Sequence, residues 1–295
     1  VFETLFATRP EAEVRVENIA FVFVAGLITA LATGLGAIPF FFVEDFSDRW
    51  NVALWGIAPG IMVSASLFGL INEGLAYSAA GFPTLLAVGL LVGVALVEVA
   101  DRVLDSIDVG GVDDPALENE DAPLGAAAFA RTDLKKLVLI LGILTGHSCP
   151  EGVAVGVSFA ELGLEGGLTV FGISVPLLAV FMTVAISIHN VPEGTAIAIP
   201  MRAMGLSKWR MVGAAVFSSL PQPIGAVIAF VFVTWAREFL PFGFGFAAGA
   251  MVYLVATEFI PEALDTGADL PAGGRRELLV GLLAGVAAML PLLYV

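Results

Sequence analysis

The sequence predicts an all-α integral membrane protein in which eight transmembrane helices form one bundle. Hydrophobic residues make up 58% of the 295 residues, charged residues make up 14%, and the mean hydropathy is +0.95, which is far more apolar than a water-soluble domain. A helix that crosses the hydrocarbon core needs about 17–25 mainly apolar residues. Eight segments meet this requirement, at 18–43, 51–77, 81–104, 134–160, 168–200, 209–235, 241–262 and 276–295.

These eight spans take up almost the whole chain, so we expect a single membrane domain over 1–295. The N-terminal 17 residues, short connectors and the stretch 105–133 remain outside them. The stretch 105–133 is rich in acidic residues, and we expect a solvated, largely disordered cytoplasmic loop. An acidic vestibule that attracts metal cations is the alternative for this stretch.

The distribution of basic residues predicts the orientation of the bundle. Ten of the 13 Lys and Arg residues lie in connections from an odd to an even span. Cytoplasmic loops of membrane proteins carry such an excess of positive charge, so we expect both termini outside. The net charge of −15 argues against a nucleic-acid partner, which leaves the lipid bilayer as the expected surroundings.

The two histidines of the chain begin two closely similar phrases inside apolar segments. His147 opens H-S-C-P-E-G in the fourth span, and His189 opens H-N-V-P-E-G in the fifth. Each phrase places a glutamate, Glu151 or Glu193, four residues after its histidine and therefore on the same helix face. If the two helices are neighbours, they bring together imidazole and carboxylate groups, which are ligands of divalent metals.

A structural use of these four side chains is the alternative. A histidine can donate a hydrogen bond between helices, and a protonated glutamate can pack as a neutral group. Each ionisable side chain placed at mid-membrane costs about 2.5–3.5 kcal/mol on insertion scales. Four such residues at matching depth and spacing favour a functional metal site.

These motifs resemble those of the ZIP (Zrt/Irt-like) family of divalent metal-ion transporters, and in particular its GufA-like prokaryotic branch. The resemblance extends over essentially the whole chain and includes the eight spans and the paired H-[NS]-x-P-E-G phrases. Three further segments share it: T-G-L-G-A-I-P at 33–39, S-S-L-P-Q-P-I-G-A at 218–226 and G-A-M-V-Y-L-V-A-T-E-F-I-P-E-A at 249–263.

The resemblance implies a binuclear metal site between spans four and five. Ser148 stands where asparagine is commoner in the family, which exchanges one neutral oxygen ligand for another. Met62 in span two matches a position that often supplies a ligand to the first ion, although a methionine in a span ordinarily serves packing. The matching positions in spans four and five are His147, Ser148, Glu151, His189, Asn190 and Glu193.

Span six departs from the family pattern at Gln222, where the E-P-x-G-A phrase commonly has a glutamate. Glu151 and Glu193 are then the formal negative charges of the site. Two divalent ions would leave a net positive charge in a medium of low dielectric constant, which is costly. We therefore expect one tightly bound ion and at most a weak second one.

Other acidic residues within the spans mark a candidate path for the ion. Glu73 lies near the outer end of span two, where it is a candidate for the entrance, although a position at the membrane interface is its ordinary explanation. Asp101 and Glu258 lie toward the cytoplasmic ends of spans three and seven, where the family is thought to release its ion.

The resemblance implies transport of divalent ions into the cytoplasm, with zinc as the first expectation and Fe²⁺, Mn²⁺, Co²⁺ and Cd²⁺ as further candidates. The metal is cargo, and no cofactor is expected. No nucleotide-binding G-x-x-x-x-G-K-[ST] phrase is present, so we expect transport to follow ion gradients. Family analogy implies an elevator-like step in which spans one, four, five and six move against the rest.

We expect a homodimer in the plasma membrane of a prokaryote. An intramembrane metal-dependent hydrolase, in which the ion activates water, is the alternative function. The H-E-x-x-H motif of zinc proteases is absent, and each histidine is followed by a glutamate at ligand spacing.

Overall fold

The computed structural model describes residues 16–42, 47–77, 83–106, 147–164, 167–203 and 205–290. Helices make up nearly all of these ranges, and the sheet found among them is one two-stranded hairpin. Six helical stretches of the described chain are long and apolar enough to cross a membrane. The predicted all-α membrane fold is confirmed, while the count of eight spans and the outside location of both termini stay predictions.

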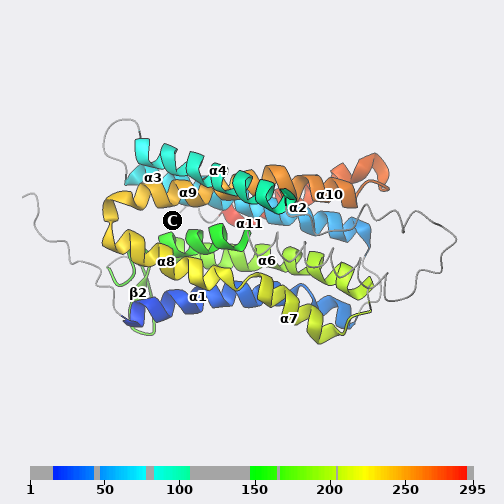
Figure 1. The fold of residues 1–295 in the computed structure, drawn as a ribbon, viewed down its shortest axis with the longest axis horizontal. Coiled ribbons are helices and arrows are strands. Elements are labelled where there is room, and N and C mark those ends of the chain that lie inside the picture. The colour runs from blue at the N-terminus through cyan, green and yellow to red at the C-terminus, as the bar shows by residue number, and fades with distance from the viewer. Residues whose placement is uncertain are drawn as a thin grey trace, which may run out of the picture.

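The helices form two bundles, which lie one above the other in Figure 1. The upper bundle consists of α2 (Asp48–Ser64), the π-helix η2 (Ala65–Ile71), α3 (Asn72–Ala76), α4 (Thr84–Ser106), α9 (Leu240–Leu254), the π-helix η4 (Val255–Phe259), α10 (Ile260–Thr266), the 3₁₀-helix η5 (Pro271–Gly274) and α11 (Arg275–Met289). The lower bundle consists of α1 (Val16–Leu35), the 3₁₀-helix η1 (Ile38–Phe41), the helical segment 147–158, α6 (Leu177–Ala203), α7 (Lys208–Ser218) and α8 (Pro221–Trp235). The 3₁₀-helix η3 (Arg237–Phe239) leads from α8 to α9.

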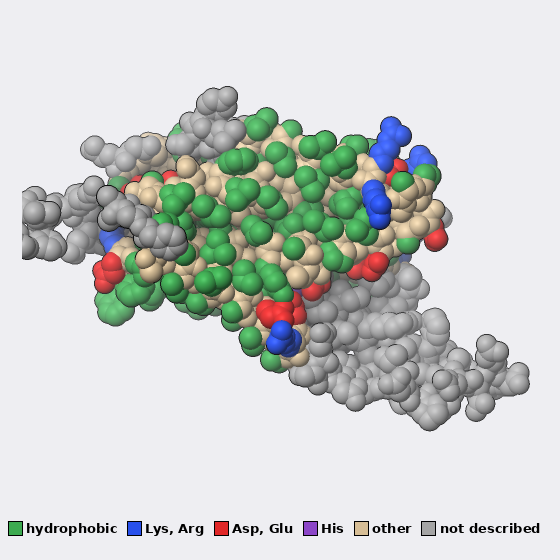
Figure 2. Space-filling view, turned by 90° about the horizontal axis from the view of Figure 1, so that it is seen from above, with side chains coloured by type: hydrophobic (Ala, Val, Ile, Leu, Met, Phe, Trp, Pro, Cys, Tyr) green, Lys and Arg blue, Asp and Glu red, His purple; other side chains and the backbone are tan. Residues whose placement is uncertain are grey.

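The surface of the molecule suits a lipid environment. Figure 2 shows hydrophobic side chains over most of the visible face, with acidic and basic side chains at its margins. Many large apolar residues of α1, α4 and α11 are exposed, among them Leu91 of α4 and Val280 of α11. A soluble protein would bury such residues, whereas a bilayer solvates them.

Glycines bring two helix pairs of the upper bundle to backbone contact, α2 with α11 and α4 with α9. A Cβ atom at Gly60 would lie 2.3 Å from the carbonyl oxygen of Leu282, and one at Gly93 would lie 2.1 Å from that of Phe246. Those distances leave no room for a larger side chain, as at small-residue crossings of other membrane helices. The glycines of the two crossings are Gly56, Gly60, Gly281 and Gly285 in the first pair and Gly89, Gly93, Gly245 and Gly249 in the second.

The lower bundle is tied together in the same way. The helical segment 147–158 lies against α8, where a Cβ atom at Gly152 would be 2.3 Å from the carbonyl oxygen of Gln222. The end of α1 lies against α6, where a Cβ atom at Gly194 would be 1.7 Å from the carbonyl oxygen of Thr33. Both phrases H-x-x-P-E-G thus end in a glycine that lets its helix approach a neighbour closely.

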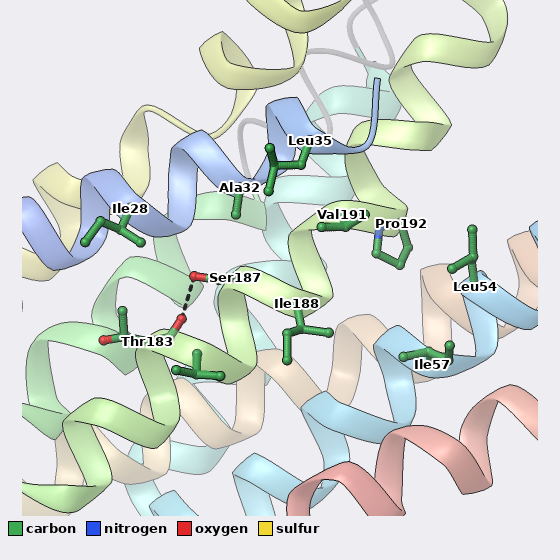
Figure 3. Close-up of a pocket in the computed structure, with 11 residues that line it drawn as sticks. Ile28, Ala32, Leu35, Leu54, Ile57, Thr183, Ser187, Ile188, Val191 and Pro192 are labelled. Carbon is green, nitrogen blue, oxygen red and sulfur yellow. Dashed lines mark hydrogen bonds between the residues drawn. The ribbon is translucent and has the colours of Figure 1, made fainter. Parts of the chain in front are cut away.

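The boundary between the bundles is packed less tightly. α2 of the upper bundle contacts α6 of the lower one, and Gly69 meets α6 through the side chains of Leu178 and Met182 at 3.2 and 3.7 Å from an added Cβ atom. An apolar groove of about 500 Å³ lies between α1, α2 and α6. In Figure 3, Ile188 and Val191 of α6 line this groove together with side chains of α1 and α2.

The fifth span begins later than the sequence predicts. Residues 168–175 of the predicted span 168–200 form a hairpin of β1 (Leu168–Val170) and β2 (Ile173–Val175), with Val170 paired to Ile173. The turn residues Phe171 and Gly172 have φ angles of 50° and 82°, and two positive values in succession form a tight hairpin turn rather than a helix. α6 then starts at Leu177, directly after Pro176.

Two further spans are interrupted. The predicted span 209–235 consists of α7 and α8, which are separated at residues 219–220, and Pro221 opens α8 at a position where its missing N–H is tolerated. The predicted span 241–262 contains the π-helix η4 between α9 and α10. Residues 107–146, which include most of the predicted acidic loop and the start of the fourth span, lie outside the described ranges.

Candidate metal centre

Three fully buried side chains of the lower bundle form the first cluster of metal-binding groups. One ligand atom from each of Glu151, His189 and Glu193 lies within 4.8 Å of the others. Glu151 comes from the helical segment 147–158, whereas His189 and Glu193 lie one turn apart on α6. We call this set the buried cluster.

The buried cluster holds two carboxylates in surroundings that exclude water. His189 Nε2 is hydrogen-bonded to Glu151 Oε1 at 2.9 Å. Within the described residues, neither carboxylate oxygen of Glu193 has a hydrogen-bond partner, and Nδ1 of His189 has none either. Buried carboxylates are normally compensated by a cation or by hydrogen bonds. One imidazole and two carboxylates therefore fit a divalent cation both in ligand type and in charge.

A chain of amide hydrogen bonds holds the second oxygen of Glu151. Gln222 Nε2 donates to Glu151 Oε2 at 2.5 Å, and Asn190 Nδ2 donates to Gln222 Oε1 at 3.0 Å and to the carbonyl oxygen of Thr29 at 2.8 Å. Gln222 and Asn190 are both fully buried. The family glutamate at position 222 would offer a negative charge here, whereas the amide of Gln222 offers hydrogens to Glu151.

A second cluster contains His147 and lies between the bundles. One ligand atom from each of Asp101, His147 and Glu258 lies within 4.8 Å of the others, and His147 Nε2 is 3.6 Å from Asp101 Oδ1. Asp101 belongs to α4 and Glu258 to η4, both in the upper bundle, while His147 begins the described part of the fourth span in the lower bundle. We call this set the bridging cluster.

The sequence analysis expected the two histidines and two glutamates at one point, and the structure divides their ligand atoms between two adjoining clusters. His147 and Glu151 lie on the same face of one helix, as their spacing predicts, but their ligand atoms belong to different clusters. Four residues advance a helix by about 6 Å, so each cluster is set by the neighbours that approach its own turn. Asp101 and Glu258 approach the turn of His147, and α6 approaches the turn of Glu151.

The other predicted ligands lie beside these clusters. Ser148 is buried, and its hydroxyl donates to the carbonyl oxygen of Ser218 at 3.1 Å. Met62 is fully buried in α2, within the apolar core that the two bundles share. A ligand role for Met62 or Ser148 stays a prediction.

The predicted entrance residue Glu73 lies in α3, near the point where the bundles meet at the hairpin end. Glu73 and Glu161 are close enough to repel each other. The hydroxyl of Tyr77, which follows α3, donates to the carboxylate of Glu161, which follows the helical segment 147–158. This bond joins the upper bundle to the lower one.

Sequence reasoning missed an aromatic side chain at the buried cluster. Phe259 directly follows Glu258, and its ring centroid lies 5.1 Å from that of His189. Trp55 of α2 packs against the same phenylalanine at 5.5 Å. The sequence feature that could have indicated this role is the position of Phe259 directly after the intramembrane acid Glu258, in A-T-E-F-I-P.

Comparisons with known proteins agree with the resemblance seen in the sequence. The family profile described as ZIP Zinc transporter matches residues 116–293, which include both histidine phrases. Zinc transporter ZIPB of Bordetella bronchiseptica is 34% identical over 276 residues, covering 92% of this chain and 80% of that protein. Zinc transporter GufA of Myxococcus xanthus is 28% identical over 275 residues, covering 91% and 96%.

One similar plant protein is much longer. A protein of Arabidopsis thaliana, described only as a candidate zinc transporter, is 37% identical over 238 residues, or 80% of this chain. The present chain spans 33% of the length of that relative.

Proposed function

Because the chain belongs to the ZIP family of zinc transporters, we propose that it carries divalent metal ions across a membrane, with zinc as its first substrate. The observation that carries this proposal is the buried cluster, in which the fully buried side chains of Glu151, His189 and Glu193 meet. The family consists of transporters, so the chain is not an intramembrane hydrolase. The metal is its cargo and not a cofactor.

The ligands of the buried cluster suit one Zn²⁺ ion. Imidazole and carboxylate bind zinc, iron(II), manganese, cobalt and cadmium, whereas copper(I) prefers sulfur ligands. Glu151 and Glu193 neutralise the charge of one divalent ion. Asn190 and Ser148 are neutral oxygen donors nearby, and Met62 is a further candidate ligand from α2.

The bridging cluster supplies the next position on the path. Asp101 and Glu258 are half-buried, whereas the ligands of the buried cluster have no exposure. Water therefore reaches the bridging cluster more easily, and an ion there is closer to release. We assign Asp101, His147 and Glu258 to the cytoplasmic exit, and Glu73 to the opposite entrance.

The arrangement of the bundles supports an elevator-like step. Backbone contacts at glycines tie the helices within each bundle, whereas side chains and a groove separate the two bundles. Rigid units with a less tightly packed boundary move relative to one another more easily than they deform. The lower bundle holds the buried cluster and would carry the ion with it.

The remaining features of the proposal concern the cellular setting. The protein is a multi-pass membrane protein, and we place it in the plasma membrane with transport directed into the cytoplasm. We also propose a homodimer, in which the exposed apolar helices of each copy contact lipid or the second copy.

Uptake of Zn²⁺ by proteoliposomes tests this function. We expect zinc-dependent accumulation by the wild-type protein and its loss in His189→Ala, because that variant removes the imidazole of the buried cluster. Glu262→Gln, an exposed position in α10, is the matched control and should transport like wild type. Equal uptake by liposomes with and without wild-type protein would refute the proposal.

A further inference from the structure

The phenyl ring of Phe259 lies between the two bundles at the buried cluster. Its exposed fraction is 2%. The ring meets Trp55 of the upper bundle, with 5.5 Å between centroids, and also the imidazole of His189, with 5.1 Å between centroids. The upper bundle therefore touches the candidate metal ligand of the lower bundle through an apolar ring.

This ring also stands where the two clusters adjoin. Glu258, the preceding residue, belongs to the bridging cluster, while Phe259 contacts a member of the buried cluster. The helical segment 147–158 makes the same connection, since His147 belongs to one cluster and Glu151 to the other. The two clusters are thus about one helical turn apart along this segment, and the end of η4 lies beside the step from one to the other.

Hydrogen bonds constrain the imidazole of His189 less than they do in most metal sites. In most metal sites the second nitrogen of a ligand histidine donates to a carboxylate, a carbonyl or water, which fixes the ring. Nδ1 of His189 has no such partner among the described residues. If Nε2 turns from Glu151 to an ion, the ring is held by packing, to which the ring of Phe259 contributes.

The backbone at this point is suited to a local change of register. Phe259 is the last residue of the π-helix η4, and Pro261 follows in the first turn of α10. A π-helical turn is wider than an α-helical one and is frequent at functional sites, and a proline removes a backbone donor. A small rotation of η4 would move Phe259 and Glu258 together.

We propose that Phe259 is the inner gate of the buried cluster: its ring positions His189 and closes the step toward Asp101, His147 and Glu258. An apolar constriction of this kind blocks a hydrated ion without binding it. The assignment rests on the transport function proposed above. Phe259 is a positioning residue, because it acts through the imidazole and contributes no ligand atom.

The test measures the release of zinc from the loaded protein. Purified wild-type and variant proteins in lipid nanodiscs are loaded with Zn²⁺ and mixed rapidly with a fluorescent zinc chelator. We expect Phe259→Leu to release zinc about three- to tenfold faster than wild type, since the loss of one aromatic contact changes a rate by about that factor. The equilibrium Kd should change less than the release rate, and in liposomes kcat should change more than KM.

Phe230→Leu is the matched control, because Phe230 is an equally buried ring in α8. It loses the same volume eight residues after Gln222 and should release zinc at the wild-type rate. If Phe259→Leu does not fold, Phe259→Met keeps an apolar side chain of similar size and should still accelerate release.

The possible results separate the gate from the transport function. Wild-type uptake together with unchanged release in Phe259→Leu and Phe259→Met would overturn the gate and leave the function standing. Equal acceleration in Phe230→Leu would also overturn the gate, because it would show a general effect of core volume. Absence of zinc binding and uptake by the wild-type protein would overturn both proposals.

Discussion

The buried cluster and the bridging cluster contain similar side chains but are held in different ways. Both combine one histidine with two carboxylates. All members of the buried cluster belong to the lower bundle, whose helices are tied at backbone contact, whereas the bridging cluster joins residues of both bundles. Relative movement of the bundles would preserve the first set and take the second apart.

This difference suits the two chemically similar sites to different tasks, namely holding an ion during movement and releasing it. A cluster within one rigid unit can keep an ion while that unit moves. A cluster across a moving boundary exists in one arrangement and is lost in the other, so it can receive an ion and then release it. The half-buried acids of the bridging cluster, Asp101 and Glu258, are consistent with this second task.

A matched substitution in the two clusters should give the largest effect. Glu193→Gln removes one of two buried charges that balance the ion, and we expect zinc affinity to fall at least about 100-fold, beyond the range seen for supporting residues of metal sites. Glu258→Gln should lower affinity at the buried cluster by less than about threefold. Isothermal titration of both variants measures the contrast, and equal losses would remove the distinction between the clusters.

The next largest effect should be on the rate of zinc release. Here a substitution in the bridging cluster should matter more than it does for zinc affinity. We expect Asp101→Asn to slow zinc uptake about tenfold at saturating zinc while KM changes little, because the exit is impaired and the buried cluster is intact. Glu98→Gln is the control: Glu98 lies one turn earlier on α4, where it accepts hydrogen bonds from Tyr253 and Arg102. A rise in KM without a fall in kcat would place Asp101 in binding instead.

Gln222→Glu should sharpen the comparison by changing the number of ions in the lower bundle. The new carboxylate would replace the amide that donates to Glu151, and we expect a second zinc ion to bind in titration. Without metal, the additional buried charge should lower the free energy of unfolding by about 1–3 kcal/mol. Gln222→Met, which removes the donor but adds no charge, should keep a stoichiometry of one. A single ion in Gln222→Glu would contradict our explanation of this position.

The smallest effect is expected at the opposite end of the boundary between the bundles. Tyr77→Phe removes the hydroxyl that links the upper bundle to Glu161 of the lower one. Because Glu161 is exposed, we expect a change in uptake rate of about two- to fivefold, as for a weak hydrogen bond, with unchanged zinc affinity. Phe171→Leu, at the exposed tip of the hairpin, is the control. Loss of zinc binding in Tyr77→Phe would show that the link supports the buried cluster and not the movement.

The candidate site was partly predictable because helix periodicity is a local property. The spacing of His189 and Glu193 fixes both on one face of α6, and the family pattern draws attention to Gln222. Depth along the spans also suggested Asp101 and Glu258 for the release path, but not their approach to His147. Phe259 could not be assigned in this way, since it reaches His189 from a helix distant in the sequence. The hairpin at 168–175 was missed because an apolar segment of that length also fits a span.

The sequence by itself determined that this chain is an all-α membrane protein of the ZIP family with two histidine and glutamate pairs at helical spacing. Composition, span length and motif are properties of the sequence or of short segments of it, so they can be recognised without the structure. Only the tertiary structure decided that His147 and His189 belong to different clusters, because the residues that approach each turn come from helices distant in the sequence. The same packing placed Phe259 against His189, which no local pattern specifies.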